Sequence, residues 1–167
     1  MNLFLLRHAK AEDHGSRLPE DNKRPLTPGG EKEMVRVAQG MRHIASRFDL
    51  ILSSPSLRAK RTAEIVADAV ASTRIHLSKH LLTDGDSRQL IQELNDNYGS
   101  VKNVLLVGHE PFLSGLISLL ATGGEKLSIN FKKAGLCKLK VGELRAGRCA
   151  KLEWLFEPGQ IAQIRKR

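Results

Sequence analysis

The sequence is poor in aromatic residues and has no long hydrophobic run, and each shortage excludes a class of protein. Phe, Trp and Tyr make up 4% of the chain, which argues against a stacking platform for single-stranded nucleic acid. No segment reaches the ~20 apolar residues that a transmembrane helix needs. The first residues lack the basic region and the cleavage-site pattern of a signal peptide. We therefore expect a cytoplasmic protein without a membrane anchor.

Cysteine is also scarce, and the two cysteines, Cys137 and Cys149, form no metal-binding motif. They make no C-x-x-C pair and have no histidines at zinc spacing, so we expect no structural metal and no cofactor. They could pair across two adjacent strands, but free thiols in a reducing compartment are the simpler expectation. With 41% hydrophobic and 27% charged residues, residues 1–167 have the composition and length of a single globular domain.

Positive charge is in excess and is concentrated. The formal net charge is +9, and residues 132–151 alone carry seven Lys or Arg side chains and one Glu. A concentrated basic patch indicates an anionic partner, which could be a phosphate group, an acidic protein surface or nucleic acid. A solvated edge of late strands is the alternative without a functional role.

Short apolar runs alternate with amphipathic segments along the chain. The pattern predicts strands at 2–6, 50–52, 74–77, 104–107, 135–141 and 149–156, and helices at 28–48, 57–70, 90–98 and 112–121. Thr27-Pro28 and Ser54-Pro55 are typical helix starts, and Asp86 is a typical N-cap. Residues 10–26 read as a long loop. Strands that alternate with helices predict an α/β fold, a three-layer αβα sandwich with a mostly parallel central sheet and late antiparallel strands near its edge.

Basic side chains and imidazoles follow three of the predicted strands. Arg7 and His8 follow the first, Arg58 lies one helical turn beyond the second, and His109 follows the strong strand 104–107. Ligands of open α/β sheets bind beyond the carboxyl ends of the strands. Arginine offers bidentate donors to phosphoryl oxygens, and a neutral histidine is a competent nucleophile at phosphorus. Each residue alone has a structural explanation, but their joint placement indicates a phosphoryl-transfer pocket.

Four segments carry a family resemblance. Leu6-Arg7-His8-Ala9 resembles an Arg-His-Gly signature, and Arg24–Gly30 reads R-P-L-T-P-G-G, which is similar to R-x-L-T-x-x-G. Residues 53–63 (SSPSLRAKRTA) and 107–111 (VGHEP) resemble S-S-P-x-x-R-A-x-x-T-A and V-G-H-x-P. In this order they resemble the histidine phosphatase (phosphoglycerate mutase-like) superfamily. The short chain is similar to its SixA-type phosphohistidine phosphatase branch.

The resemblance implies a phosphoglycerate mutase-like fold and a set of roles. His8 would be the nucleophile that becomes phosphohistidine, and Arg7, Arg58 and His109 would complete the phosphate pocket, with Arg24 as a further phosphate- or substrate-binding residue. The implied activity is metal-independent removal of phosphate from a phosphohistidine-bearing protein, such as a phosphotransfer or signalling domain.

The sequence departs from the family pattern at two points. Ala9 replaces the signature glycine, which is tolerable only if its φ is not positive. No clear general acid is present: Asp84 and, more weakly, Glu110 are candidates, while turn and cap chemistry explains Asp86. A weak acid suits phosphohistidine better than an alkyl phosphate, because a protonated imidazole leaves without strong acid catalysis.

Two other functions remain open from the sequence. One is a phosphatase of a small phosphomonoester or a nucleotide. The other is a non-catalytic phosphate- or nucleic-acid-binding module that uses the basic patch at 132–151, although the scarcity of aromatic residues disfavours nucleic acid. For an enzyme, the same patch would steer an acidic phosphoprotein toward the pocket.

Overall fold

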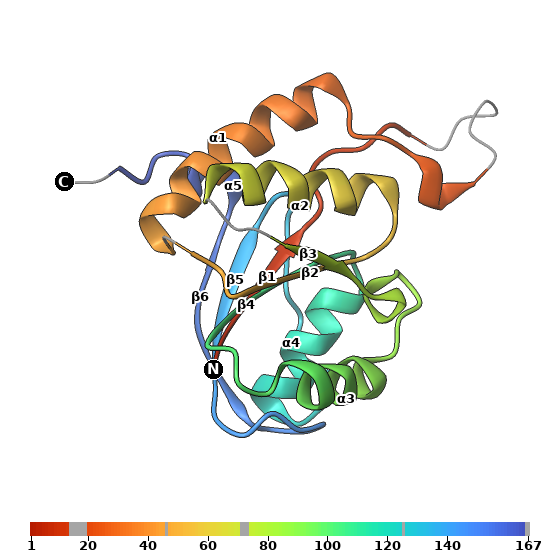
Figure 1. Cartoon of the computed structure of the whole chain (residues 1–167), viewed down its shortest axis with the longest axis vertical. Coiled ribbons are helices and arrows are strands. Elements are labelled where there is room, and N and C mark those ends of the chain that lie inside the picture. Colours follow the sequence, from red (N-terminus) through yellow and green to blue (C-terminus); the bar gives the residue numbers. More distant parts are fainter. Residues whose placement is uncertain (14–19, 46, 71–73, 125, 166–167) are drawn as a thin grey trace.

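A mixed sheet forms the centre of the computed structural model, which describes residues 1–13, 20–45, 47–70, 74–124 and 126–165 (Figure 1). Within these residues it has six strands in the order β3-β2-β4-β1-β5-β6. The strands are β1 (Asn2–Arg7), β2 (Leu50–Ser53), β3 (Ile75–Leu77), β4 (Asn103–Gly108), β5 (Leu136–Val141) and β6 (Ala150–Phe156). β1 to β4 pair in parallel, while β5 and β6 are antiparallel and β6 is an edge. The predicted mostly parallel sheet is therefore confirmed.

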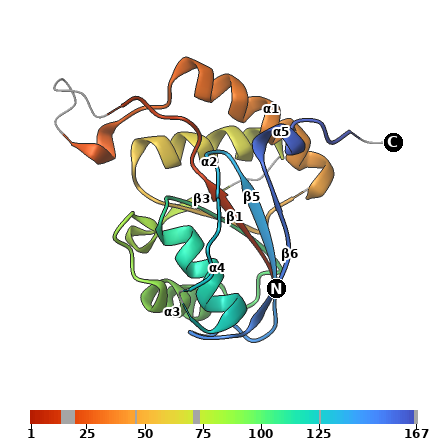
Figure 2. The same ribbon diagram turned by 180° about the vertical axis from the view of Figure 1, so that it is seen from behind.

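Helices cover both faces of this sheet, which confirms the three-layer prediction (Figures 1 and 2). The helices are α1 (Pro28–Ile44), α2 (Leu57–Ala69), α3 (Ser87–Tyr98), α4 (Phe112–Thr122) and α5 (Pro158–Ile161), with short 3-10 turns η1 (Asp21–Lys23) and η2 (Lys79–Leu81). α1, α2 and α5 lie on one face, and α3 and α4 lie on the other. None of the helices in the described ranges is both long and apolar enough to cross a bilayer.

Strand β1 shows why its residues form a central strand. Phe4 and Leu6 pack into the core beneath α1 and α2, whereas Leu3 and Leu5 pack into the core beneath α3 and α4. All four are at most 3% exposed. Side chains alternate between the faces of a strand, so a continuous apolar run is what a sheet buried on both sides requires.

Two predicted helix starts are confirmed by their hydrogen bonds. The Thr27 hydroxyl accepts from the Gly30 amide at 2.9 Å, and the Asp86 carboxylate accepts from the amides of Arg88 and Gln89. Helix α2 begins at Leu57, where the apolar spacing predicts it, but the prediction that Ser54-Pro55 forms its start is wrong, because the N-cap residue is Ser56 and its side chain makes no capping bond.

The predicted extension of α1 to Phe48 is also wrong. The helix ends at Ile44, and Ala45 is already extended with a φ of −142°. Phe48 is buried before β2, where its ring meets Phe4 edge-on at 5.2 Å between centroids. Phe48 thus continues the helical spacing of apolar residues, but it packs into the core from the segment that follows the helix.

Other details differ from the sequence-based expectations or add to them. Of the predicted loop 10–26, residues 14–19 lie outside the described residues, while a bridge between Ala11 and Leu26 and the turn η1 order parts of the rest. Helix α5 was not predicted. Cys137 and Cys149 are free thiols, as expected, and burial raises the pKa of Cys137 to about 12.

Candidate active site

The residues that follow the central strands meet at the carboxyl ends of those strands. Arg7 ends β1 and His8 follows it, His109 follows β4, and Arg58 lies in the first turn of α2 after β2. β1 and β2 both pair with β4, so these strand ends are neighbours. The rings of His8 and His109 lie 4.9 Å apart between centroids. The Arg58 Nε lies 3.3 Å from the His8 Nε2.

The protonation of His8 follows from its two contacts. Its Nδ1 lies 2.7 Å from the Ala9 carbonyl oxygen, which only accepts hydrogen bonds, so Nδ1 carries the hydrogen. Nε2 then holds a lone pair, toward which the Arg58 Nε–H points. Burial, followed by the neighbouring His109 and arginine charges, lowers the pKa of His8 to about 3 despite the bond to Ala9. His8 is therefore a neutral imidazole at physiological pH, the form that is able to act as a nucleophile.

Arg58 is fixed by a residue that the sequence analysis missed. Its NH1 donates to the Asp21 backbone oxygen at 2.6 Å, and its NH2 pairs with the Asp21 Oδ2 at 2.7 Å. Burial opposes ionisation of Asp21, but the hydrogen bonds and charges of Arg58 and Arg24 outweigh it and lower its pKa. Asp21 is thus an ionised carboxylate beside the pocket.

Arg24, the predicted additional binding residue, supports Asp21. Its Nε and NH2 both bind the Asp21 Oδ1, and its NH1 donates to the Glu12 carbonyl at 2.8 Å. It therefore reaches the pocket through Asp21. The local signal for this pair was the Asp21–Arg24 spacing across a turn, but nothing local linked Asp21 to Arg58.

Two buried nitrogens of the pocket are left without a partner. The Arg7 Nε and the His109 Nδ1 bind no acceptor among the described residues, although the Arg7 NH1 donates to the Phe131 oxygen at 2.7 Å. Burial lowers the pKa of His109 to about 4, aided by the charge of Arg58. Buried polar atoms are nearly always paired, so these nitrogens are poised to bind ligand oxygens.

Neither candidate acid makes a hydrogen bond or an ion pair with the pocket residues among the described residues. Asp84 is exposed, and no hydrogen bond or ion pair in the described residues joins it to the pocket. Glu110 is half-buried, with its Oε1 accepting from the Ser114 amide at 2.9 Å, and its charge raises the pKa of Arg7 against the larger lowering by burial.

Ala9 fits its place without backbone strain. Among the described residues other than glycine, only Ala134 has a positive φ. The Ala9 amide donates to the Thr62 hydroxyl at 3.1 Å, and its side chain is fully buried. The condition set for an alanine at the signature glycine position is met.

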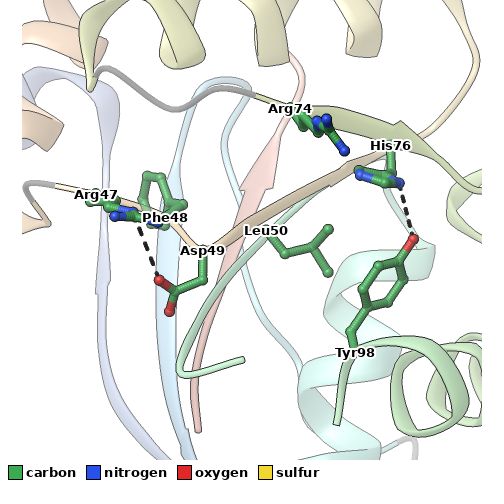
Figure 3. Close-up of a pocket in the computed structure, with 7 residues that line it drawn as sticks. All are labelled: Arg47, Phe48, Asp49, Leu50, Arg74, His76 and Tyr98. Atoms are coloured by element: carbon green, nitrogen blue, oxygen red, sulfur yellow. Dashed lines mark hydrogen bonds and ion pairs between the residues drawn. The ribbon is translucent and has the colours of Figure 1, made fainter. Parts of the chain in front are cut away.

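A separate cavity lies at the opposite end of the strands, near the amino-terminal ends of β2 and β3 (Figure 3). It has a volume of about 290 Å³ and is lined by residues at the amino-terminal ends of β2 and β3 and by Tyr98 of α3. His76 binds the Tyr98 hydroxyl there at 3.2 Å. None of the predicted site residues lines it. Within the described ranges, no cluster of three or more His, Cys, Asp or Glu side chains could hold a metal ion.

The geometry around His8 defines a class of site. A neutral imidazole whose unprotonated Nε2 faces the Arg58 Nε lies near a second arginine and a second neutral imidazole. This arrangement is suited to attack on a phosphoryl group whose oxygens are held by positive donors. Comparison with known proteins agrees. The model of the histidine phosphatase superfamily (branch 1) matches residues 3–82. Together with the relatives described below, this match shows that the chain belongs to the superfamily.

Relatives extend the match beyond residue 82. An uncharacterized protein of Picosynechococcus sp. is 34% identical over 146 residues, which cover 87% of this chain and 88% of that protein. The phosphohistidine phosphatase SixA of Escherichia coli is 28% identical over 127 residues, 74% of this chain and 76% of SixA. A structure of SixA complexed with tungstate superposes with a TM-score of 0.83 at 24% identity, over 96% of this chain and 99% of that one. The SixA resemblance and the fold are therefore confirmed, and the matches support a phosphatase.

Proposed function

We propose that the protein is a phosphohistidine phosphatase that acts on a phosphoprotein through a covalent phospho-His8 intermediate. The observation that carries the choice of substrate is that neither candidate acid makes a hydrogen bond or an ion pair with the described pocket. Asp21 is ionised, Asp84 makes no contact with the pocket, and the Glu110 carboxylate binds a backbone amide. An alkyl phosphate needs a proton for its leaving oxygen, and this pocket is poor in proton donors.

The first step transfers the phosphoryl group to His8. The Nε2 lone pair attacks phosphorus, and the P–N bond of the substrate breaks with its electron pair going to the substrate nitrogen. A substrate imidazole that already carries a proton on its other nitrogen then leaves as a neutral ring. The Arg7 Nε and the His109 Nδ1 are the buried nitrogens free to bind the phosphoryl oxygens, and the Arg58 Nε lies beside the attacking atom.

The second step regenerates His8. A water oxygen attacks phosphorus, the P–Nε2 bond breaks, and the electron pair returns to Nε2. Both hydrogens of the water leave on the inorganic phosphate, so the ring keeps its single hydrogen on Nδ1, where the Ala9 carbonyl binds it. The negative Asp21 carboxylate at the edge of the pocket opposes retention of the phosphate anion.

The test compares two substrate classes on the same enzyme preparation. We expect kcat/KM for a chemically phosphorylated, histidine-containing phosphotransfer protein to exceed that for a panel of phosphomonoesters and nucleotides by about 100-fold, roughly 3 kcal/mol of transition-state stabilisation. Activity in EDTA should equal activity without it. Equal or better turnover of one phosphomonoester would reject the phosphohistidine proposal and favour a small-molecule phosphatase.

A trapping experiment tests the intermediate separately. Rapid quenching in alkali with ³²P-labelled substrate should leave an acid-labile label on the peptide that contains His8. His8→Ala should remove both the label and the hydrolysis of an activated aryl phosphate. Unchanged hydrolysis by His8→Ala would mean that the site does not use this nucleophile, and tight salt-dependent binding of DNA would then favour the binding-module alternative.

A further inference from the structure

Two buried serines between β2 and α2 contact the second histidine of the pocket. The Ser54 Oγ lies 2.9 Å and the Ser56 Oγ 3.1 Å from the His109 Nε2. Ser54 is 0%, Ser56 1% and His109 1% exposed. Neither hydroxyl caps α2, so the helix start does not explain these serines.

Counting hydrogens in this cluster compares the two neutral tautomers of His109. If Nε2 carried the hydrogen, it would donate to the Ser54 hydroxyl, which would donate to the Ser56 Oγ at 3.4 Å. The Ser56 hydroxyl hydrogen would then have no acceptor among the described residues. A buried donor without an acceptor is costly.

The other tautomer satisfies every hydroxyl. With a lone pair on Nε2, the Ser54 hydroxyl donates to it at 2.9 Å, and Ser54 also accepts from the Ser56 amide at 3.3 Å. The Ser56 hydroxyl, at 3.1 Å, donates to the same lone pair. The ring hydrogen then lies on Nδ1, the buried atom without a partner. A bound phosphoryl oxygen would accept this hydrogen and leave every donor of the cluster satisfied, whereas no ligand on Nδ1 would satisfy the Ser56 hydroxyl in the other tautomer.

We infer that Ser54 and Ser56 are positioning residues that hold His109 as a neutral imidazole with its hydrogen on Nδ1, as a donor to the phosphoryl group. The inference rests on the pocket of the proposed function. It explains why the His109 Nδ1 acts as a hydrogen-bond donor there beside the two arginines. The two histidines thus have the same tautomer and opposite uses. His8 gives its Nδ1–H to the protein and its Nε2 to phosphorus, while His109 gives its Nε2 to the protein and its Nδ1–H to the ligand.

Charged groups around His109 favour the same neutral state. Those that act on it are Arg58, Asp21, Arg7 and Arg24, with the neutral His8 ring in contact. Three of these are cations that oppose an imidazolium ion, and Asp21 is the single anion that favours it. The surrounding charges therefore favour the neutral ring, but they do not determine which nitrogen carries the hydrogen. The serine hydroxyls favour one of the two neutral tautomers.

Ring ¹⁵N NMR tests the inference directly. In the labelled wild-type protein, we expect the His109 signals of an imidazole protonated at Nδ1. Ser54→Ala with Ser56→Ala should give a mixture of tautomers and weaken vanadate binding about 10-fold, the equivalent of one hydrogen bond. Ser53→Ala is the matched control, because Ser53 is equally buried but donates only to the Ser54 carbonyl.

The outcomes separate this inference from the choice of substrate. A wild-type His109 protonated at Nε2 would overturn it, and this measurement needs no variant. Unchanged tautomer and vanadate affinity in the double variant would overturn it as well. Because neither readout uses a phosphoprotein, a failure of the phosphohistidine proposal would leave both results standing.

Discussion

At the scale of single residues, the pocket depends on the directions in which its donors point as well as on their charge. Arg7→Lys keeps the positive charge but removes the guanidinium Nε–H that is buried without a partner. We expect kcat/KM for an aryl phosphate to fall about 100-fold. This corresponds to about 3 kcal/mol of transition-state stabilisation, as for the loss of one preorganised donor. The control is Arg61→Lys, because Arg61 pairs with Glu31 and Glu64 on the surface. This substitution should leave kcat/KM unchanged. A smaller than 10-fold loss in Arg7→Lys would show that charge alone suffices.

The Asp21 carboxylate and the phosphate product interact with the same arginine. Asp21→Asn removes a negative charge 2.7 Å from the Arg58 NH2 while keeping the side-chain shape. Inorganic phosphate should therefore inhibit the variant at a concentration about 5-fold lower, since a partly exposed ion pair contributes on the order of 1 kcal/mol. The control is Asp84→Asn, which should not change the inhibition constant. Weaker inhibition in Asp21→Asn would mean that the carboxylate mainly orients Arg58.

The sequence motifs located the four residues that converge but not those that orient them. Arg7, His8, Arg58 and His109 stand directly after strands, where a topological rule applies. Asp21 acts on Arg58 only because the turn η1 folds over α2, and Ser54 reaches His109 only because β2 lies beside β4. Such contacts join segments that are distant in the sequence, so no local sequence pattern predicts them.

At the scale of elements, close packing of α1 against the last helix depends on one glycine. A Cβ added at Gly40 would lie 1.9 Å from the Ile161 backbone oxygen, so α1 or α5 would have to move. We expect Gly40→Ala to lower the free energy of unfolding by about 2 kcal/mol, a typical cost of overpacking. Gly159→Ala in α5 meets no atom within 4 Å and serves as the control in the same chemical denaturation experiment. Equal stabilities would show that α5 shifts without cost.

Element prediction succeeded where burial and periodicity coincide. The apolar runs that became β1 and β4 are buried on both faces, so composition alone marked them. The end of α1 was misplaced because Phe48 continues the helical spacing but packs on Phe4 from the next segment. The four residues of α5 are too few to show a period, and a capping box with its partner at Gln160 defines the start.

At the scale of the whole molecule, two buried neutral histidines link folding to pH. Their pKa values are about 3 and about 4 in the folded protein, below the 6.5 of an unfolded histidine. The unfolded chain thus binds more protons below pH 6.5, and stability falls as the pH drops from there toward 4, by up to about 1.4 kcal/mol per unit for each histidine. Replacing His109 by Gln should flatten this slope in denaturation curves between pH 6.5 and 4.5. An unaltered slope would mean that His109 is protonated in the fold.

The basic patch at 132–151 is divided by the fold. Because β5 runs antiparallel to β1, Lys132 and Lys133 lie at the end of the sheet that holds the pocket, while Lys140 pairs in register with Asn2 at the opposite end. Lys132 is paired with Glu157, and Lys133 has no ion pair among the described residues. The Ala134 amide binds the Arg7 and His8 carbonyls, which fixes this turn beside the pocket. We propose that Lys133, rather than the whole patch, attracts an acidic phosphoprotein.

Charge reversal tests this division. Lys133→Glu should lower kcat/KM for an acidic phosphoprotein about 5-fold at low salt, with the loss shrinking as ionic strength rises, and should change aryl phosphate turnover by about 2-fold or less. Lys140→Glu should leave both substrates unaffected. Equal effects of the two variants would assign steering to the net charge of the protein.

The bond from the His8 Nδ1 to the carbonyl of its own neighbour, Ala9, has a consequence for timing. In the proposed intermediate, the hydrogen held on Nδ1 makes the phosphorylated ring cationic. The ring then leaves phosphorus as neutral imidazole, a far better leaving group than the imidazolate anion. A main-chain oxygen cannot be removed by exchanging a side chain, so under the proposed mechanism the backbone at Ala9 itself favours transfer of the phosphoryl group to water over its storage on His8.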